Sequence, residues 1–337
     1  MGEHVVVAMD KFRSTAVASE LATAIAGCGV EGTTFDVATL SDGGEGFRSA
    51  FRGDVVSLQV RDPWGEWHEA PLTLVTTGYG VLGVIEVAEI IGRSRRRAPT
   101  SNEALAASSA GVGDAIVASA SWGVTHVVVG CGGSATSDGG EGCYEVLLNA
   151  GELGISLSAA TDIDAEFLGA LRYAEQKGVA RSDLAVVQQR LEKLADRYER
   201  QSGLDVRHTA RTGAAGGLSG ALFALGANLV SGLDEVVNVN NLAARMKWAS
   251  TIITGEGRFD AGSLEGKVVS GVCALTTEGQ RVLVVCGSSD IEAVNVLIDR
   301  YPWVRVVDLV SRFGERRALS DTIESVAQVA REFLVDY

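Results

Sequence analysis

The chain has 337 residues and a formal net charge of −14, from 29 Lys and Arg against 43 Asp and Glu. At roughly 150 residues per domain, this length predicts about two domains. So acidic a chain is a poor partner for nucleic acid or for an anionic membrane surface, because both attract basic proteins. A hydrophobic content of 46% excludes wholesale disorder.

Short runs of β-branched residues alternate with helical patterns along most of the chain. Uniformly apolar strands separated by helices are typical of an α/β fold with a parallel sheet. Strands are predicted at 4–9, 33–39, 125–129, 250–254, 281–286 and 304–309, and helices at 17–26, 103–121 and 322–334.

The middle of the chain departs from this alternation. The strand-like runs 55–60 and 67–75 flank the turn Asp62-Pro63-Trp64-Gly65, which predicts a β-hairpin, and 182–201 predicts a long polar helix. We interpret this middle as a second α/β domain inserted into the first. The predicted boundaries place residues 1–54 and 245–337 in the first domain and 55–244 in the inserted one.

The termini and cysteines indicate the compartment. No basic region or cleavage site precedes the first apolar strand, and no apolar stretch approaches 18 residues, so we expect a cytoplasmic protein with no membrane partner. The five cysteines form no CxxC pair and the four histidines do not cluster with them. This pattern predicts buried free thiols, not disulfides or a zinc site.

A six-residue sequence, SDGGEG, occurs twice, at 41–46 and at 137–142. Each copy follows a predicted strand and precedes a possible helix. Consecutive glycines leave backbone N–H groups unscreened, and a helix N-terminus adds partial positive charge, so such a loop suits a bound anion. The alternative is a pair of capped strand-to-helix turns that bind nothing.

Two further glycine loops allow a close approach to phosphate. The run GCGGSA at 130–135 follows an apolar strand and fits the dinucleotide fingerprint G-x-G-x-x-A, so an NAD-dependent oxidoreductase is one interpretation. A pyrophosphate there would need a metal to offset Asp138. The run TGAAGGLSG at 212–220 suits either a bound phosphate or the tight packing of two helices.

The segment 254–267 carries the most ionisable groups. It follows a predicted strand, and ligands in open α/β sheets bind beyond the carboxyl ends of strands. Glu256 and Asp260 offer oxygen ligands for Mg²⁺, and Arg258 can bind a carboxylate or phosphate with two hydrogen bonds. A surface salt-bridge network is the alternative. A Walker A motif is excluded, because one spacer residue is missing and Val268 stands where Ser or Thr is required.

Two acidic positions add to this set. Asp10 ends the first strand, and Asp162 and Asp164 are two residues apart, which on an extended segment directs both to the same side. The latter pair could hold metal or act as a base, or form an exposed acidic turn.

In this order along nearly the whole chain, the motifs resemble the bacterial type-1 glycerate kinases, which transfer phosphate from Mg·ATP to D-glycerate. The resemblance implies two α/β domains, one flavodoxin/Rossmann-like with a parallel sheet and one inserted, with the active site in the cleft. The chain departs from the family at 9–13, where Met9, Lys11 and Arg13 replace Pro, Ser and Lys. It also departs at 161–167, which keeps the acids but loses Asn-Pro, and it is shortened between 142 and 162.

From the residues and the resemblance we expect in-line phosphoryl transfer to D-glycerate, with 2-phosphoglycerate favoured, by a monomer or homodimer. Alternatives are a silent family member that binds nucleotide or a small acid, and the oxidoreductase. The expected roles are catalysis by Asp162, Asp10, Arg258 and Lys267; substrate binding by Arg13, Asp42, Gly43, Gly44, Arg258 and Ser263; ATP binding by Gly132, Gly133, Ser134, Ala135, Thr136, Gly213, Gly216 and Gly217; and Mg²⁺ binding by Asp138, Glu256 and Asp260.

Overall fold

The computed structural model describes residues 3–12, 15–95, 98–264 and 267–335. The chain divides into two compact units, unit 1 with residues 1–42 and 236–337 and unit 2 with residues 43–235. The sequence places its boundaries instead at 54/55 and 244/245. Residues 46–48 belong to unit 2 because the buried carboxylate of Glu86 accepts hydrogen bonds from the backbone N–H groups of Gly46 and Arg48.

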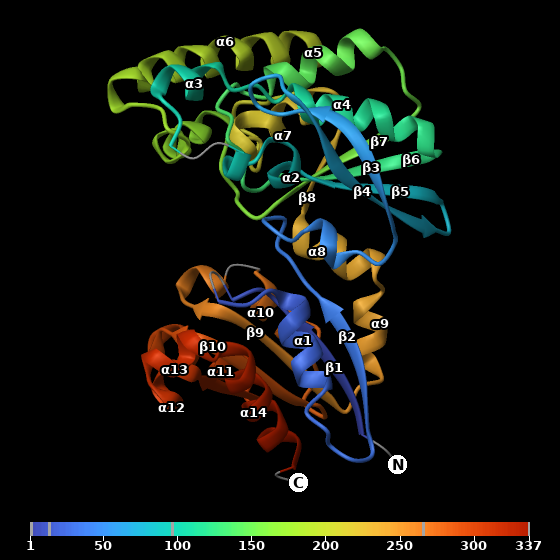
Figure 1. Ribbon diagram of the computed structural model, residues 1–337, viewed down its shortest axis with the longest axis vertical. Helices are drawn as coiled ribbons and strands as arrows, with labels where there is room; N and C mark the ends of the chain where they lie inside the picture. Colours follow the sequence, from blue (N-terminus) through green and yellow to red (C-terminus); the bar gives the residue numbers. More distant parts are fainter. Residues whose placement is uncertain (1–2, 13–14, 96–97, 265–266, 336–337) are drawn as a thin grey trace. The chain divides into compact units, whose positions relative to one another are not determined.

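Unit 1 contains a five-stranded parallel sheet in the order β11-β10-β9-β1-β2 (Figure 1). Counted along this unit, the strand order is 2-1-3-4-5, which is the flavodoxin-like order. The predicted α/β class is therefore confirmed. The elements are β1 (Glu3–Met9), α1 (Ala18–Ala26), β2 (Thr33–Thr39), α9 (Leu242–Lys247), β9 (Thr251–Phe259), η7 (Ala261–Leu264), α10 (Val268–Ala274), β10 (Arg281–Ser289), α11 (Ile291–Arg300), β11 (Val304–Asp308), α12 (Leu309–Phe313), α13 (Glu315–Ser320) and α14 (Thr322–Val335).

The unit-1 sheet is covered on both faces. Val5 and Val7 pack with residues of α1 and α14 in one apolar cluster, and these helices lie side by side against the sheet in Figure 1. Side chains alternate across a strand, so Val6 and Ile252, which are also fully buried, face the other layer. This is why the strands are apolar throughout and were recognisable in the sequence.

Unit 2 contains a six-stranded mixed sheet in the order β3-β4-β5-β6-β7-β8. The first three strands are antiparallel, and β5 to β8 are parallel. The elements are η1 (Arg48–Ala50), β3 (Asp54–Arg61), β4 (Trp67–Thr77), β5 (Gly80–Glu86), α2 (Val87–Ile91), η2 (Arg93–Arg95), α3 (Ser101–Ala106), α4 (Ala110–Ser119), η3 (Ala120–Trp122), β6 (Val124–Gly130), α5 (Glu141–Ala150), β7 (Ser156–Thr161), η4 (Phe167–Tyr173), η5 (Glu175–Lys177), η6 (Arg181–Asp183), α6 (Leu184–Ser202), α7 (Ala214–Ala224), β8 (Asn228–Ser231) and α8 (Gly232–Val239), which crosses the boundary between units.

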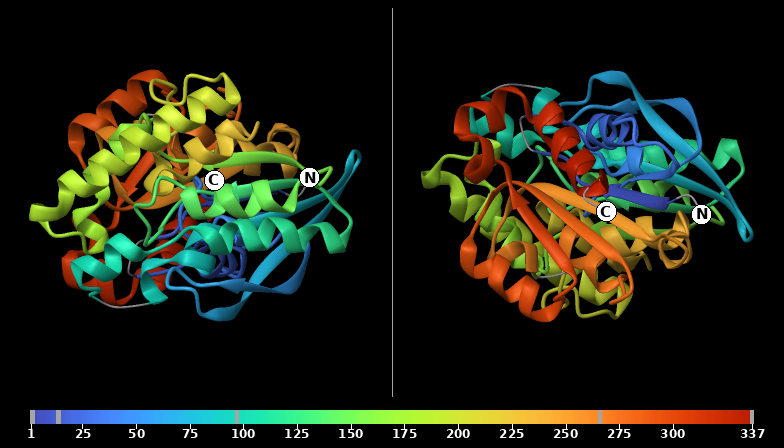
Figure 2. Two further views of the ribbon diagram at one scale, coloured as in Figure 1. Left: turned by 90° about the horizontal axis from the view of Figure 1, so that it is seen from above. Right: turned by 90° about the horizontal axis from the view of Figure 1, so that it is seen from below.

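Two apolar clusters hold unit 2 together. One joins the sheet to α4 and α5, which lie alongside each other in Figure 2. The other joins η4, α6 and α7 around Phe167 and Tyr198.

The predicted hairpin is present as β3 and β4, with Arg61 paired to Trp67, and the predicted polar helix is α6. All five cysteines are free, and all but Cys28 are buried, as predicted.

The predicted helix over 103–121 is wrong in its middle, where Ala107–Ser109 are not helical. The cause is a tertiary contact: the backbone N–H and the hydroxyl of Ser109 both donate to Asp138 Oδ2 at 2.7 Å. By length and composition the stretch Ser101–Trp122 could cross a membrane, yet half of it is buried inside the protein, and α4 packs on the sheet of unit 2. It is a core element of that unit.

The strand predicted at 250–254 is longer than expected and continues to Phe259. Arg258 still pairs with Ser288 of β10. Glycines make this close pairing possible, since a Cβ on Gly255 would lie 2.1 Å from the carbonyl oxygen of Val285. Residues 256–258 are therefore strand residues, not loop residues.

We expect Gly255→Ala to destabilise the protein by about 1–3 kcal/mol, because the added methyl group overpacks the strand pair. Gly279→Ala is the matched control, since a Cβ there meets nothing within 4 Å. Urea unfolding of both variants measures the difference. Equal midpoints for the two variants would contradict the packing argument.

Candidate active site

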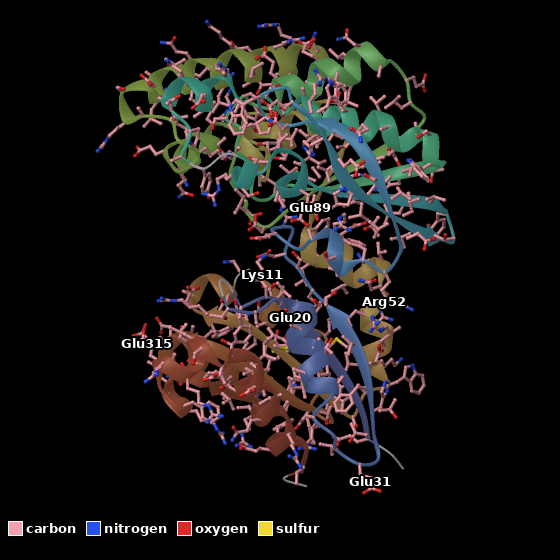
Figure 3. All side chains as sticks on the ribbon, in the orientation of Figure 1. Lys11, Glu20, Glu31, Arg52, Glu89 and Glu315 are labelled. Atoms are coloured by element: carbon pink, nitrogen blue, oxygen red, sulfur yellow. The ribbon has the colours of Figure 1, made fainter. Side chains whose placement is uncertain are left out.

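A cavity of about 540 Å³ lies in unit 1 at the carboxyl end of its parallel sheet. Figure 3 shows Lys11, which follows β1, and Glu31, which precedes β2, at opposite ends of this sheet. β1 and β9 are neighbours, and β2 continues the sheet on one side while β10 continues it on the other. This is the topological switch point, where open α/β sheets bind ligands. The cavity is lined by Asp10, Lys11, Phe12, Thr15, Asp42, Glu256, Gly257, Arg258, Asp260, Ser263, Lys267, Gly287, Ser288, Val310, Glu315, Ala318 and Leu319.

Glu256 is the buried acid of this cavity. Its pKa is raised to about 8, chiefly by burial; Asp10 and Asp260 add to the rise, while the Ser263 hydroxyl and Lys267 oppose it. Its Oε1 is buried and has no hydrogen-bond partner among the described residues. A buried oxygen without a partner costs free energy, so the position favours a ligand or cation that would complete it.

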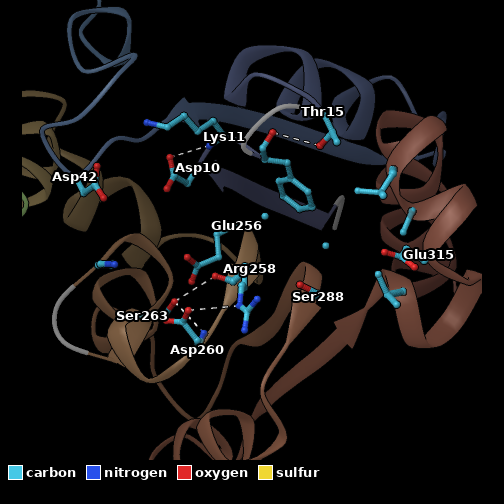
Figure 4. Close-up of a pocket in the computed structure, with 17 residues that line it drawn as sticks. Asp10, Lys11, Thr15, Asp42, Glu256, Arg258, Asp260, Ser263, Ser288 and Glu315 are labelled. Carbon is cyan, nitrogen blue, oxygen red and sulfur yellow. Dashed lines mark hydrogen bonds and ion pairs between the residues drawn. The ribbon is translucent and has the colours of Figure 1, made fainter. Parts of the chain in front are cut away.

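Acidic and basic side chains converge on the same space from several elements. In Figure 4, Asp10 and Glu256 lie in the same part of the cavity, and the Glu256 carboxylate is directed toward the side of Ser263 and Asp260. Arg258 Nε lies 3.6 Å from Asp260 Oδ2, and the Arg258 side chain is 75% exposed, so this ion pair is weak and the guanidinium can engage a ligand. The Ser263 hydroxyl donates to the carbonyl oxygen of Arg258 at 3.4 Å.

Lys267 is the N-cap residue of α10 and lines the same cavity. A Cβ on Gly262 would lie 3.2 Å from Asp260 Oδ1 and 3.4 Å from Lys267 Nζ. The glycine therefore leaves room for both groups, and the Gly262 N–H itself donates to Asp260 Oδ1 at 3.0 Å. The structure brings together the predicted residues Asp10, Asp42, Glu256, Arg258, Asp260, Ser263 and Lys267; Arg13 lies outside the described residues.

The donor set fits magnesium. Within the described parts of the chain, no group of three or more His, Cys, Asp and Glu side chains is arranged to hold a metal ion by itself. Mg²⁺, however, is usually held by one or two carboxylates, with phosphates and water supplying the other ligands. Glu256, with its unpartnered Oε1, and Asp260 in the same cavity match this pattern.

The two SDGGEG copies have different structures. The first leads only into the short η1, and Gly43 lies against the end of β7, where its Cβ would be 3.2 Å from the Ala160 carbonyl oxygen. Gly44 lies against Gly132, whose Cβ would be 2.5 Å from Gly44 Cα. The structure thus brings predicted substrate-binding glycines beside a predicted ATP-binding glycine.

The second copy opens α5 as expected, and its Asp138 caps the turn. Besides Ser109, the backbone N–H groups of Gly140 and Gly142 donate to the Asp138 carboxylate, each at 3.2 Å. Asp138 is only 5% exposed. These contacts occupy both oxygens, so they favour a role in fixing the loop over the metal-binding role expected from the sequence.

The glycine loop at 212–220 contacts the second SDGGEG copy and Thr136, which precedes that copy by one residue. The Gly139 N–H donates to the Gly216 carbonyl oxygen at 3.0 Å, and a Cβ on Gly216 would lie 2.1 Å from the carbonyl oxygen of Thr136. Ala215, Gly216 and Gly217 all have positive φ angles, so their backbone forms a left-handed turn inside α7. The backbone N–H groups of Ala135 and Gly213 donate to carbonyl oxygens of Ile91 and Ala165, and are already engaged.

Asp162 and Asp164 follow the end of β7 in unit 2. Asp164 accepts a hydrogen bond from Arg211 at 2.9 Å, and its side chain is 77% exposed. Asp162 is partly buried, and its charge helps to raise the pKa of the buried Cys131 thiol, although burial contributes more. The two acids therefore have separate surroundings, and only Asp162 is close to the glycine loop at 130–132.

Comparisons with known proteins identify the family of the chain. The sequence profile of the glycerate kinase family matches residues 5–151 and 148–334. The chain belongs to the glycerate kinase family. It is 30% identical over 334 residues to glycerate 2-kinase of Escherichia coli K12, covering 87% of each chain, and 29% identical to a glycerate kinase of Halalkalibacterium halodurans, covering 84% and 85%. An uncharacterized protein of Mycobacterium bovis is 34% identical over 80% of this chain and 74% of its own.

A crystal structure that bears the name glycerate kinase 2, from Salmonella typhimurium LT2, is also similar to this chain. The TM-score is 0.80 with 26% sequence identity, and the match covers 98% of this chain and 97% of that one. Membership of the glycerate kinase family makes the chain a phosphotransferase with an alcohol group as acceptor. The oxidoreductase interpretation is not supported, since α5 begins at Glu141 and not directly after the fingerprint-like run ending at Ala135.

Two buried charged residues of unit 2 were missed by the sequence analysis. Glu86, at the end of β5, holds the first SDGGEG loop, and burial raises its pKa. Lys177 lies between the loops at 132–136 and 213–217. A charged residue ending an apolar strand was a usable signal for Glu86, whereas nothing around Lys177 in the sequence shows that it is buried.

We expect Glu256→Gln to make the stability of the metal-free protein less dependent on pH. The folded-state pKa of Glu256 is raised from 4.5 to about 8. Its contribution to stability is therefore complete below about pH 4.5 and is lost as pH rises through about 8. Relative to the Gln variant, the wild-type protein should lose stability over this window, on the order of a few kcal/mol.

Urea unfolding in EDTA between pH 5 and 9 measures this effect. Glu278→Gln is the matched control, because Glu278 is exposed on a turn of the same unit. Identical pH profiles for the wild type and both variants would show that Glu256 is not desolvated as described.

Proposed function

We propose that the protein is a glycerate 2-kinase that transfers the terminal phosphate of Mg·ATP to D-glycerate, forming 2-phosphoglycerate. Membership of the family gives the reaction class, and a relative that aligns over 87% of each chain is named glycerate 2-kinase. The observation that carries the proposal is the cavity at the switch point of unit 1. It combines three cationic side chains, of Lys11, Arg258 and Lys267, with the acids Asp10, Glu256 and Asp260.

The cations of this cavity suit an acid substrate. Arg258 is exposed and can bind a carboxylate with two hydrogen bonds, and Lys267 supplies a second positive charge. The Ser263 hydroxyl, Asp42 and Lys11 line the same space. We assign these groups to the carboxylate and hydroxyls of glycerate and to the phosphate being transferred.

Glu256 and Asp260 would hold Mg²⁺, and the ion would supply neutralisation of the phosphate charge during transfer. A nearby cation stabilises the ionised form of Glu256 and so lowers its raised pKa.

In unit 2 the loops at 132–136 and 213–217 remain our candidates for the nucleotide phosphates. A cytoplasmic location and a monomeric or homodimeric state complete the proposal.

The base that orients the acceptor hydroxyl is proposed to be Asp162, with Asp10 second. Asp162→Asn should lower kcat about 100-fold, the range expected for a positioned base, with a smaller change in KM for glycerate. Asp10→Asn, measured in the same coupled assay, separates the two candidates. Asp164→Asn is the matched control, since this exposed carboxylate is paired with Arg211. A loss confined to Asp10→Asn would assign the base to Asp10.

Phosphorus NMR of the protein incubated with D-glycerate and Mg·ATP tests the whole proposal. We expect ADP and a new phosphomonoester whose signal is a doublet, because the phosphate of 2-phosphoglycerate neighbours a single C–H. A triplet, from a neighbouring CH₂ group, would identify 3-phosphoglycerate. Product formation should stop in EDTA and resume with Mg²⁺. Binding of ATP without any phosphomonoester would favour the silent family member instead.

A further inference from the structure

Lys177 is a buried lysine that the mechanism above does not use. It ends the short helix η5 in unit 2 and is 8% exposed. Its Nζ donates to the Ser134 hydroxyl at 2.9 Å and to the Thr136 carbonyl oxygen at 2.7 Å. A Cβ on Gly216 would lie 2.9 Å from the same Nζ. One ammonium group therefore contacts both glycine loops proposed for phosphate binding.

This ammonium group has no counterion. Both of its acceptors are neutral, and across the residues that the structure describes no carboxylate lies within 4.0 Å of Nζ. Asp138 acts on it only at longer range, and its carboxylate is occupied by Ser109, Gly140 and Gly142. A lysine has three N–H donors, so one donor remains. Buried charges in proteins are normally paired.

The surroundings carry charges of both signs: Arg93 and Glu175 line the same pocket, and Asp138 acts at longer range. The pKa of Lys177 is lowered to about 7, chiefly by burial; Asp138 opposes this shift and Arg93 adds to it. The Thr136 hydroxyl is fully buried and has no hydrogen-bond partner among the described residues. Thr136 therefore carries both the carbonyl oxygen that accepts a hydrogen bond from Lys177 Nζ and a buried hydroxyl without a partner.

Lys177 also lines a pocket of about 430 Å³ that lies wholly within unit 2. Trp64 and Pro99 give the pocket apolar walls, Ala135 belongs to the glycine loop, and Arg93 adds a second cation. An anion entering this pocket would reach both Lys177 and the loop at 132–136. The pocket is large enough for a phosphate group and the part of a ligand attached to it.

We propose that Lys177 is a phosphate-binding residue, whose third N–H donates to a phosphate oxygen of the nucleotide in this pocket. The proposal rests on the proposed function only for the identity of the anion as a nucleotide phosphate. The uncompensated charge would then serve in ligand binding: the bound phosphate supplies the missing counterion, and the two neutral acceptors hold the ammonium in place.

Calorimetric binding of ATP, tripolyphosphate, inorganic phosphate and adenosine to the full chain tests the proposal. Lys177→Met should weaken the binding of ATP and tripolyphosphate about tenfold or more, as expected for the loss of a hydrogen bond to a charged group. Adenosine, which has no phosphate, should bind as before. If inorganic phosphate alone reproduces the dependence on Lys177, the site binds phosphate without needing the nucleoside. Lys193→Met, an exposed lysine on α6, is the matched control and should change nothing.

Lys177→Arg and Arg93→Gln keep the test decisive if the Met variant fails to fold. Arg93 is exposed in the pocket, so its replacement should weaken tripolyphosphate binding about threefold without unfolding unit 2. Unchanged tripolyphosphate and ATP binding in folded Lys177 variants would overturn the proposal. Because these readouts are binding constants, weaker binding together with no turnover of glycerate would reject the proposed function and leave the Lys177 site standing.

Discussion

The parallel pairing of β1 with β9 is the constraint on which the candidate site depends. Met9, the last residue of β1, pairs with Gly255 of β9, so Glu256 has no partner in β1. On its other edge β9 continues in register with β10. Glu256 is consequently held by β10 on one side. On its other side it faces the end of β1, where Asp10 follows. A carboxylate held in this way is desolvated by the sheet itself. Its raised pKa, its unpartnered oxygen and its closeness to a second acid all follow from that one register.

In unit 2, two buried carboxylates fix the loops instead. Glu86 holds the first SDGGEG loop from a neighbouring strand, whereas the second copy is held by its own Asp138. Both acids accept backbone N–H groups, which leaves glycine backbones in left-handed conformations that no other residue adopts easily. Six identical residues thus give two different structures because different parts of the chain supply the acceptor.

Many of the strands, and helices such as α1, α6 and α14, followed from the sequence, because apolar runs such as Val5–Val7 report burial directly. The strands β5, β7 and β8 were not predicted, nor were helices such as α10 and α11, whereas the motifs indicated the family. What the sequence did not show depends on contacts between distant residues. Ser109 breaks a helix by binding Asp138, and Gly255 lets β9 run on beside β10. Lys177 has the local pattern of a surface turn, and only the folded chain reveals its burial. Arg258, Asp260 and Lys267 were found together because they share one short segment.

Unit 1 is assembled from the first and last parts of the chain, and β1 lies between β2 and β9 in its sheet. During synthesis, β1 and β2 emerge early, but one edge of β1 has no partner until residues beyond 251 have been made. All strands of unit 2 appear in the meantime, so that unit can complete its sheet first. The apolar edge of β1 is an aggregation hazard during this delay. The yield of folded protein should therefore depend more on translation rate and chaperone capacity than on the final stability of either sheet.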